Sequence, residues 1–172
     1  MQAVVCSAAF FIFALITAPV SGATTLSIPR SIQAEHEHIH HALVEATKIA
    51  GPVGAAAREL ADVLHPHFVR EEEFALPPLG LLERLAREGA TEEMAEALPM
   101  TQRLKTELPQ MLAEHKQIVG ALEELRKAAR AAGRPEVEHF AEALVLHAQT
   151  EEQVTYPTAL LIGDYLKLKL GP

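Results

Sequence analysis

Residues 35–43 read EHEHIHHAL, and residues 114–122 read EHKQIVGAL. The Glu-His pair, the isoleucine and the final Ala-Leu fall at the same places in both stretches, 79 positions apart. Apolar residues that recur three or four positions apart mark one face of a helix. The two stretches therefore predict two similar amphipathic helices, one in each half of the chain.

A second pair of stretches repeats in the same way. Residues 67–77 read HFVREEEFALP and residues 147–157 read HAQTEEQVTYP, so that His, two Glu and Pro recur 80 positions apart. The chain therefore reads as a duplicated helical hairpin. Duplication predicts an internal twofold repeat, in which residues at equivalent places in the two hairpins face each other across the bundle axis.

The remaining pattern predicts helices and no strand. Helical periodicity starts after Ser31, which we interpret as an N-cap, and it stops at Gly or Pro residues. The expected helices cover residues 31–50, 53–76, 107–133 and 135–156, with a partly helical crossover over 79–106 and a short tail helix after Pro157. The sequence thus predicts an all-α domain at residues 24–172, an antiparallel up-down-up-down four-helix bundle.

A histidine and a glutamate four positions apart can bind one metal cluster. On an α-helix such residues lie on one face, about 40° and about 6 Å apart. The pairs His67/Glu71 and His147/Glu151 meet this condition at equivalent places of the repeat. The pair His41 and Glu45 has the same spacing but no counterpart in the other half, so we interpret it as a chance match.

Four-helix bundles build metal sites from side chains that project into their centre. A single buried histidine is more often a hydrogen-bonded core residue than a ligand, but here the residues recur in pairs. The predicted metal ligands are His36, His67, Glu71, His115, His147 and Glu151. Two carboxylates with four imidazoles suit iron, with manganese as the second choice, whereas structural zinc usually takes a closed tetrahedral set with sulfur.

The order of these ligands is His36, His67-x-x-x-Glu71, His115, His147-x-x-x-Glu151, with a proline after each His-Glu pair. This order resembles the hemerythrin-like HHE cation-binding domains over roughly residues 28–160. The resemblance implies a non-haem centre of two iron ions, bridged by both glutamates and an oxo or hydroxo group. It also implies terminal imidazoles and an open position for dioxygen, nitric oxide or peroxide.

The sequence departs from oxygen-carrying hemerythrins at two positions. Their third helix carries His-x-x-x-His, whereas Val119 follows His115 here, and Glu151 stands where they use Asp. Both departures argue against simple reversible oxygen carriage. His40 aligns with Val119 in the repeat, and we hypothesise that it supplies a fifth imidazole. Without His40 as a ligand both irons have open sites, which favours peroxide chemistry.

Other polar residues lie near the predicted ligands in sequence. Tyr156 is a candidate for a redox-active neighbour of the centre. A carboxylate next to a ligand usually pairs with a cation or orients a metal-bound imidazole. The glutamates at such positions are Glu35, Glu72, Glu114 and Glu152. The histidines off the repeated pattern, expected in solvent or beside the ligands, are His38, His41, His65 and His139.

The composition argues against a nucleic-acid partner and against cysteine-based sites. A net charge of −8 leaves no basic surface with which to neutralise phosphates, and there is no Trp and little Tyr for stacking on bases. We therefore expect no nucleic-acid partner. The single cysteine, Cys6, lies in the hydrophobic leader, so the folded part can form neither an internal disulfide nor a thiolate metal site.

Residues 3–20 read AVVCSAAFFIFALITAPV, without a charge, and small residues follow at 21–23. This favours a signal peptide over residues 1–23 and export, for example to the periplasm. No Lys or Arg precedes the apolar run, and its length is close to the minimum for a membrane span, so an uncleaved membrane anchor is the second interpretation. A wrongly assigned start of a cytoplasmic protein is the third.

Three functions fit these observations. The first is a binding protein whose di-iron centre binds or senses dioxygen or nitric oxide, or takes part in iron and oxidative-stress handling. The second is a di-iron oxidoreductase that acts on peroxide or nitric oxide. The third is a metal-free helical scaffold for a protein partner.

Overall fold

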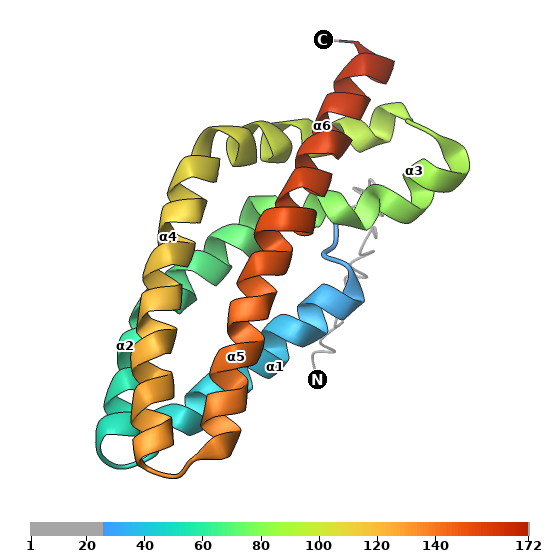
Figure 1. The fold of residues 1–172 in the computed structure, drawn as a ribbon. Helices are drawn as coiled ribbons and strands as arrows, with labels where there is room; N and C mark the ends of the chain where they lie inside the picture. Colours follow the sequence, from blue (N-terminus) through green and yellow to red (C-terminus); the bar gives the residue numbers. More distant parts are fainter. Residues whose placement is uncertain (1–25, 172) are drawn as a thin grey trace, which may run out of the picture.

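Four long helices pack into a bundle (Figure 1). The computed structural model describes residues 26–171, so the predicted leader at residues 1–23 lies outside the described residues. The four helices are α1 (Arg30–Thr47), α2 (Pro52–Arg70), α4 (Leu98–Ala131) and α5 (Pro135–Thr150). Among residues 26–171 there is no strand, and the prediction of an all-α four-helix fold is confirmed.

Two tight turns join α1 to α2 and α4 to α5. Gly51 has φ 82° in the first turn and Gly133 has φ 64° in the second, a backbone conformation that costs glycine little. Both turns lie at the same end of the bundle, at the bottom of Figure 1. The tight turns keep the two helices of each pair side by side.

Two π-helical segments continue α2 and α5 at equivalent places. They are η1 (Glu71–Ala75) and η4 (Glu151–Thr155), and each begins at a predicted metal ligand. Segments of this kind are rare and often lie at functional sites. After η1 the chain crosses over through η2 (Pro77–Leu81), α3 (Leu82–Glu88) and η3 (Glu92–Ala97), while η4 leads directly into α6 (Tyr156–Leu170).

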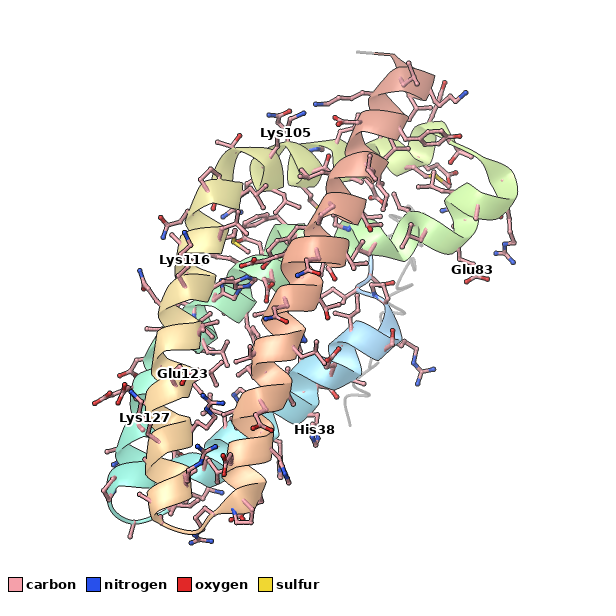
Figure 2. All side chains as sticks on the ribbon, viewed as in Figure 1. His38, Glu83, Lys105, Lys116, Glu123 and Lys127 are labelled. Atoms are coloured by element: carbon pink, nitrogen blue, oxygen red, sulfur yellow. The ribbon has the colours of Figure 1, made fainter. Side chains whose placement is uncertain are left out.

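Two predicted helix starts are wrong. The third helix begins at Leu98 rather than near Glu107, because Pro109 lies inside α4 instead of in its first turn. Proline removes one hydrogen bond and crowds the preceding turn, which bends a helix without always ending it. Figures 1 and 2 show this bend close to Lys105. The first helix begins at Arg30, and its N-cap is Pro29 rather than Ser31.

The end of the fourth helix also differs from the prediction. Instead of a stop near Tyr156 followed by a short tail, the helical path continues through η4 into α6 (Figure 1). Pro157 occupies the first turn of α6, where its missing amide hydrogen is tolerated.

The apolar core consists of two clusters. One lies at the turn end of the bundle and includes Leu60, Leu122 and Leu144. The other lies around the crossover and α6 and includes Phe74 and Met111. Each fully buried large apolar side chain stabilises the fold by roughly 1.5–3 kcal/mol. The two clusters flank a layer of buried polar residues.

The surface of the described residues is strongly charged. Side chains such as Lys116, Glu123 and Lys127 lie on the outer side of α4 (Figure 2). No helix in residues 26–171 has the length and apolar character needed to span a membrane.

Candidate metal centre

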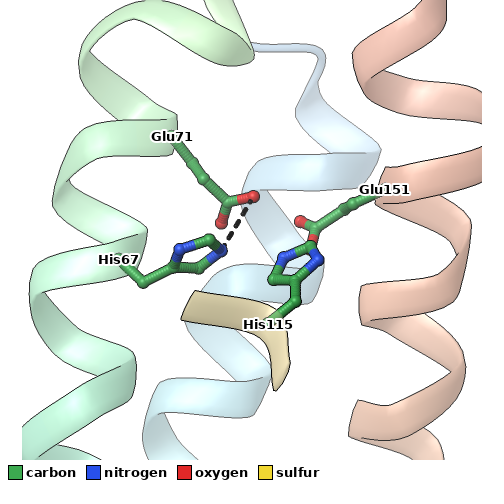
Figure 3. Close-up of side chains that lie close together, drawn as sticks. All are labelled: His67, Glu71, His115 and Glu151. Carbon is green, nitrogen blue, oxygen red and sulfur yellow. Dashed lines mark ion pairs between the residues drawn. The ribbon is translucent and has the colours of Figure 1, made fainter. Parts of the chain in front are cut away.

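The polar layer contains all six predicted metal ligands. Every one is buried, and the most exposed, His147, has 7% of its surface accessible. They come from every long helix of the bundle and from both π-helical segments. Figure 3 shows four of them, His67, Glu71, His115 and Glu151, converging between the helices.

These side chains form two overlapping groups, which we call position A and position B. Position A consists of His67, Glu71, His115 and Glu151, and position B of His36, His147 and Glu151. In each group the ligand atoms lie within 4.8 Å of one another. Glu151 belongs to both groups, so the two positions are adjacent.

Both glutamates direct one oxygen to each position. Glu71 Oε1 lies 3.5 Å from His67 Nε2 in position A, and its Oε2 lies 3.8 Å from His36 Nε2 in position B. Glu151 Oε2 lies 3.4 Å from His115 Nε2, and its Oε1 lies 2.9 Å from His147 Nε2. Two carboxylates that each span both positions are suited to bridge two cations.

Four buried atoms in and beside position B have no hydrogen-bond partner, three of them from its own residues and the fourth from Glu71 of position A, whose Oε2 lies 3.8 Å from His36 Nε2. They are His36 Nε2, His147 Nε2, Glu71 Oε2 and Glu151 Oε1. His147 Nε2 and Glu151 Oε1 are close but lack the alignment of a hydrogen bond. A buried polar group left unpaired costs about 1–3 kcal/mol. Two imidazole nitrogens and a carboxylate oxygen within 4.8 Å of one another, with Glu71 Oε2 beside them, suit a transition-metal cation.

The outer nitrogen of each imidazole meets a carboxylate. The Nδ1–H groups of three histidines donate hydrogen bonds, and the fourth Nδ1 lies in an ion pair. The four pairs are His36–Glu72 at 3.1 Å, His67–Glu114 at 2.9 Å, His115–Glu152 at 3.0 Å and His147–Glu35 at 3.1 Å. A carboxylate only accepts, so it fixes the hydrogen on Nδ1 and directs the Nε2 lone pair inward. The four glutamates predicted to orient ligands therefore lie where that role requires.

The family model for the hemerythrin HHE cation binding domain matches residues 27–159. The chain belongs to this hemerythrin family. No curated protein and no solved structure matches the chain. The matched region of this hemerythrin domain contains both positions and all four outer carboxylates, so a buried His/Glu group able to hold a metal ion agrees with the family's description.

The four His–Glu pairs connect the helices of the hemerythrin domain in a closed ring. His36 on α1 reaches Glu72 on η1, and His67 on α2 reaches Glu114 on α4. His115 on α4 then reaches η4, and His147 on α5 reaches back to α1. Arg70 adds to the ring by donating to Glu114. The contact of Arg70 with Glu114 was not predicted. The only hint of it in the sequence is that Arg70 follows His67 by three positions.

Burial and the neighbouring charges shift the pKa values of the ligands. Burial and the negative charge of Glu151 raise the pKa of Glu71. Burial also opposes ionisation of Glu151, but the close approach of His115, His147 and His36 outweighs it and lowers the pKa of that carboxyl. Burial disfavours a charged His147, but the adjacent Glu151 outweighs it and raises the pKa of His147 to about 9. The metal-free centre of the hemerythrin domain therefore holds protons at neutral pH.

Metal binding at pH 7 is expected to release protons. A metal ion binds neutral imidazole, and in the metal-free chain His147 is protonated below a pH of about 9. Apparent affinity should therefore rise from pH 7 to about pH 9, and the contribution of this group should level off above that. Calorimetric titration with Mn²⁺ in buffers of different ionisation enthalpy measures the protons released. The release should be measured at pH 7 and above about pH 9. An equal number of protons released at the two pH values would contradict the raised pKa of His147.

Two aromatic residues distinguish the two positions. The Tyr156 hydroxyl donates a hydrogen bond to Glu71 in position A, and the Tyr156 ring stacks on His115 with centroids 5.6 Å apart. Phe68 stacks on His36 of position B with centroids 4.1 Å apart. The prediction that Tyr156 lies near the centre is confirmed. Phe68 was not predicted as part of the site, because its pattern in sequence is that of a core residue.

A groove of about 570 Å³ lies between α1 and α2 beside position B. Its lining includes His36, His40, His41, His65, Phe68 and Glu72. His40 is exposed on the wall of this groove and belongs to neither position. The fifth-imidazole role of His40 stays a hypothesis, with its side chain one helical turn from His36 on the solvent side.

Proposed function

We propose that this hemerythrin domain holds two non-haem iron ions, one in position A and one in position B. The observation that carries the proposal is that Glu71 and Glu151 each direct one oxygen to each position. A single cation would use only half of these oxygens. Two cations satisfy both glutamates and also the four unpaired atoms in and beside position B.

The donor set supports iron. Carboxylate oxygens and imidazole nitrogens suit iron and manganese, and thiolate is absent because the only cysteine is Cys6 in the leader. Iron is the metal we propose, with manganese second. Bound iron would supply a Lewis acid that can also donate electrons to a small oxidant.

We also propose that the bundle is antiparallel and built from a duplicated hairpin. Equivalent residues support this: both π-helical segments begin at a ligand glutamate, Glu71 and Glu151. The outer pairs follow the same rule, since His36–Glu72 matches His115–Glu152 and His67–Glu114 matches His147–Glu35.

The function we propose is binding or sensing of a small oxidant, dioxygen or nitric oxide, or a part in iron and oxidative-stress handling. The groove beside His36 and Phe68 offers an approach to position B from solvent. The alternative is an oxidoreductase acting on peroxide or nitric oxide. Val119 stands in helix α4 where a further imidazole would be a ligand. It favours the alternative, because fewer protein ligands leave more open coordination positions on the metal.

We also propose that residues 1–23 direct export of the protein or its association with a membrane. We propose no nucleic-acid partner.

Iron loading of the full chain tests the proposal. We expect about two irons per chain and near-ultraviolet charge-transfer bands that change on reduction, both lost in His67→Ala/His147→Ala, which removes one imidazole from each position. A chain that takes up no iron, or whose iron is unaffected by the double substitution, would refute the centre. Turnover of hydrogen peroxide by the loaded chain would then separate the oxidoreductase from the binding protein.

A further inference from the structure

One difference between the two halves of the repeat bears on position A. Tyr156 stands 80 positions after Leu76, so in the repeat the two side chains correspond. Both are fully buried, with 0% of their surface accessible. The repeat therefore has a hydroxyl at residue 156 and an apolar side chain at the equivalent residue 76.

The Tyr156 hydroxyl lies among the ligand atoms of position A. Its oxygen is 3.4 Å from His67 Nε2 and 3.2 Å from His115 Nε2, and it donates a hydrogen bond to Glu71 Oε1. No hydroxyl of the described residues donates to the four atoms in and beside position B that lack a hydrogen-bond partner. The Tyr156 hydroxyl therefore contacts position A and not position B.

A hydroxyl alone cannot satisfy the atoms around it. A phenol has one hydrogen, and with neutral imidazoles it faces three acceptors, Glu71 Oε1 and the two Nε2 lone pairs. One acceptor receives the hydrogen, and the other two face the lone pairs of the phenol oxygen. A metal ion, which binds imidazoles in their neutral form, is attracted to all four of these atoms.

We propose that Tyr156 is a protein ligand of position A and binds the metal ion through its phenol oxygen. This proposal rests on the proposed function. When the metal binds, the O–H bond breaks and an oxygen–metal bond forms without transfer of electrons, and the proton passes to Glu71 and then to solvent. The charge of the metal ion offsets the cost of placing a phenolate beside two carboxylates.

The consequence is a centre with two unlike metal positions. Position A has two imidazoles, two carboxylates and a phenolate, whereas position B has the same types of ligand without the phenolate. The extra anionic oxygen stabilises the oxidised form of the ion in position A and leaves position B with the more open coordination.

The test is spectroscopic and uses the full chain loaded with iron and oxidised. Phenolate bound to ferric iron gives a visible charge-transfer band and enhanced tyrosine ring vibrations in resonance Raman spectra. We expect both in the wild-type chain and in Tyr165→Phe, the matched control on α6, which lies outside the centre. We expect Tyr156→Phe to lose both while it keeps about two irons.

The outcomes separate the two proposals. A wild-type chain that holds iron but lacks the tyrosine vibrations overturns the assignment of Tyr156 and leaves the di-iron centre standing. Vibrations that persist in Tyr156→Phe overturn it equally. A wild-type chain without iron overturns both proposals. The Raman spectrum of the wild-type chain decides the question even if Tyr156→Phe fails to fold.

Discussion

Glu151→Gln is expected to remove both metal ions from the protein. Glu151 faces His115 in position A and both His36 and His147 in position B, so it is shared by the whole centre. The amide keeps the size of the side chain but loses its charge, and its NH₂ group turns a ligand oxygen into a donor. We therefore expect the metal content to fall from about two ions per chain to none.

Glu152→Gln is the matched comparison, one position along the same segment. Glu152 accepts from His115 Nδ1 at 3.0 Å and touches no inward-facing atom. Losing such an outer partner typically lowers metal affinity by roughly 10- to 100-fold. Metal analysis after desalting, with competition against a chelator, measures both variants. Equal losses in the two variants would show that Glu151 acts only by orienting a histidine.

Removing the metal is expected to lower the free energy of unfolding. The four unpaired atoms in and beside position B are buried in the folded chain and solvated in the unfolded chain, so the metal-free fold bears a cost that the ion removes. With free metal at about 1,000 times its dissociation constant, the gain is about 4 kcal/mol.

Urea unfolding of the chain with Mn²⁺ or with a chelator measures this difference. The transition should move to higher urea when metal is present. Glu151→Gln should unfold at one urea concentration under both conditions, because it has no site to fill. Coincident transitions in the wild-type chain would mean that the metal is not bound to the folded state.

The sequence predicted well which polar residues the structure brings together, because these residues are repeated. His36 and His115, like Glu71 and Glu151, recur at nearly constant spacing, and only a shared structural role explains such a pattern. The structure places all six predicted ligands in one buried layer. A repeat therefore carries tertiary information that a single His-x-x-x-Glu pair does not.

Predictions from the sequence were less accurate where a residue type is compatible with two structural roles. Pro109 is compatible with a first turn and with a bend inside a helix, and only the packing of the long α4 selects the bend. His40 has the spacing of a ligand and lies one helical turn from His36, but the spacing does not show that its side chain is exposed on the wall of the groove. Arg70 contacts Glu114 across two helices, a pairing that no local pattern encodes.

The closed ring of His–Glu pairs also determines how the bundle can open. Two of its links, His67–Glu114 and His147–Glu35, join the α1–α2 pair to the α4–α5 pair, on opposite sides of the metal centre. Separation of the two helix pairs requires both links to break, so we expect the buried amides beside these links to exchange slowly with solvent. We therefore expect the middle section of the bundle to unfold as one cooperative unit.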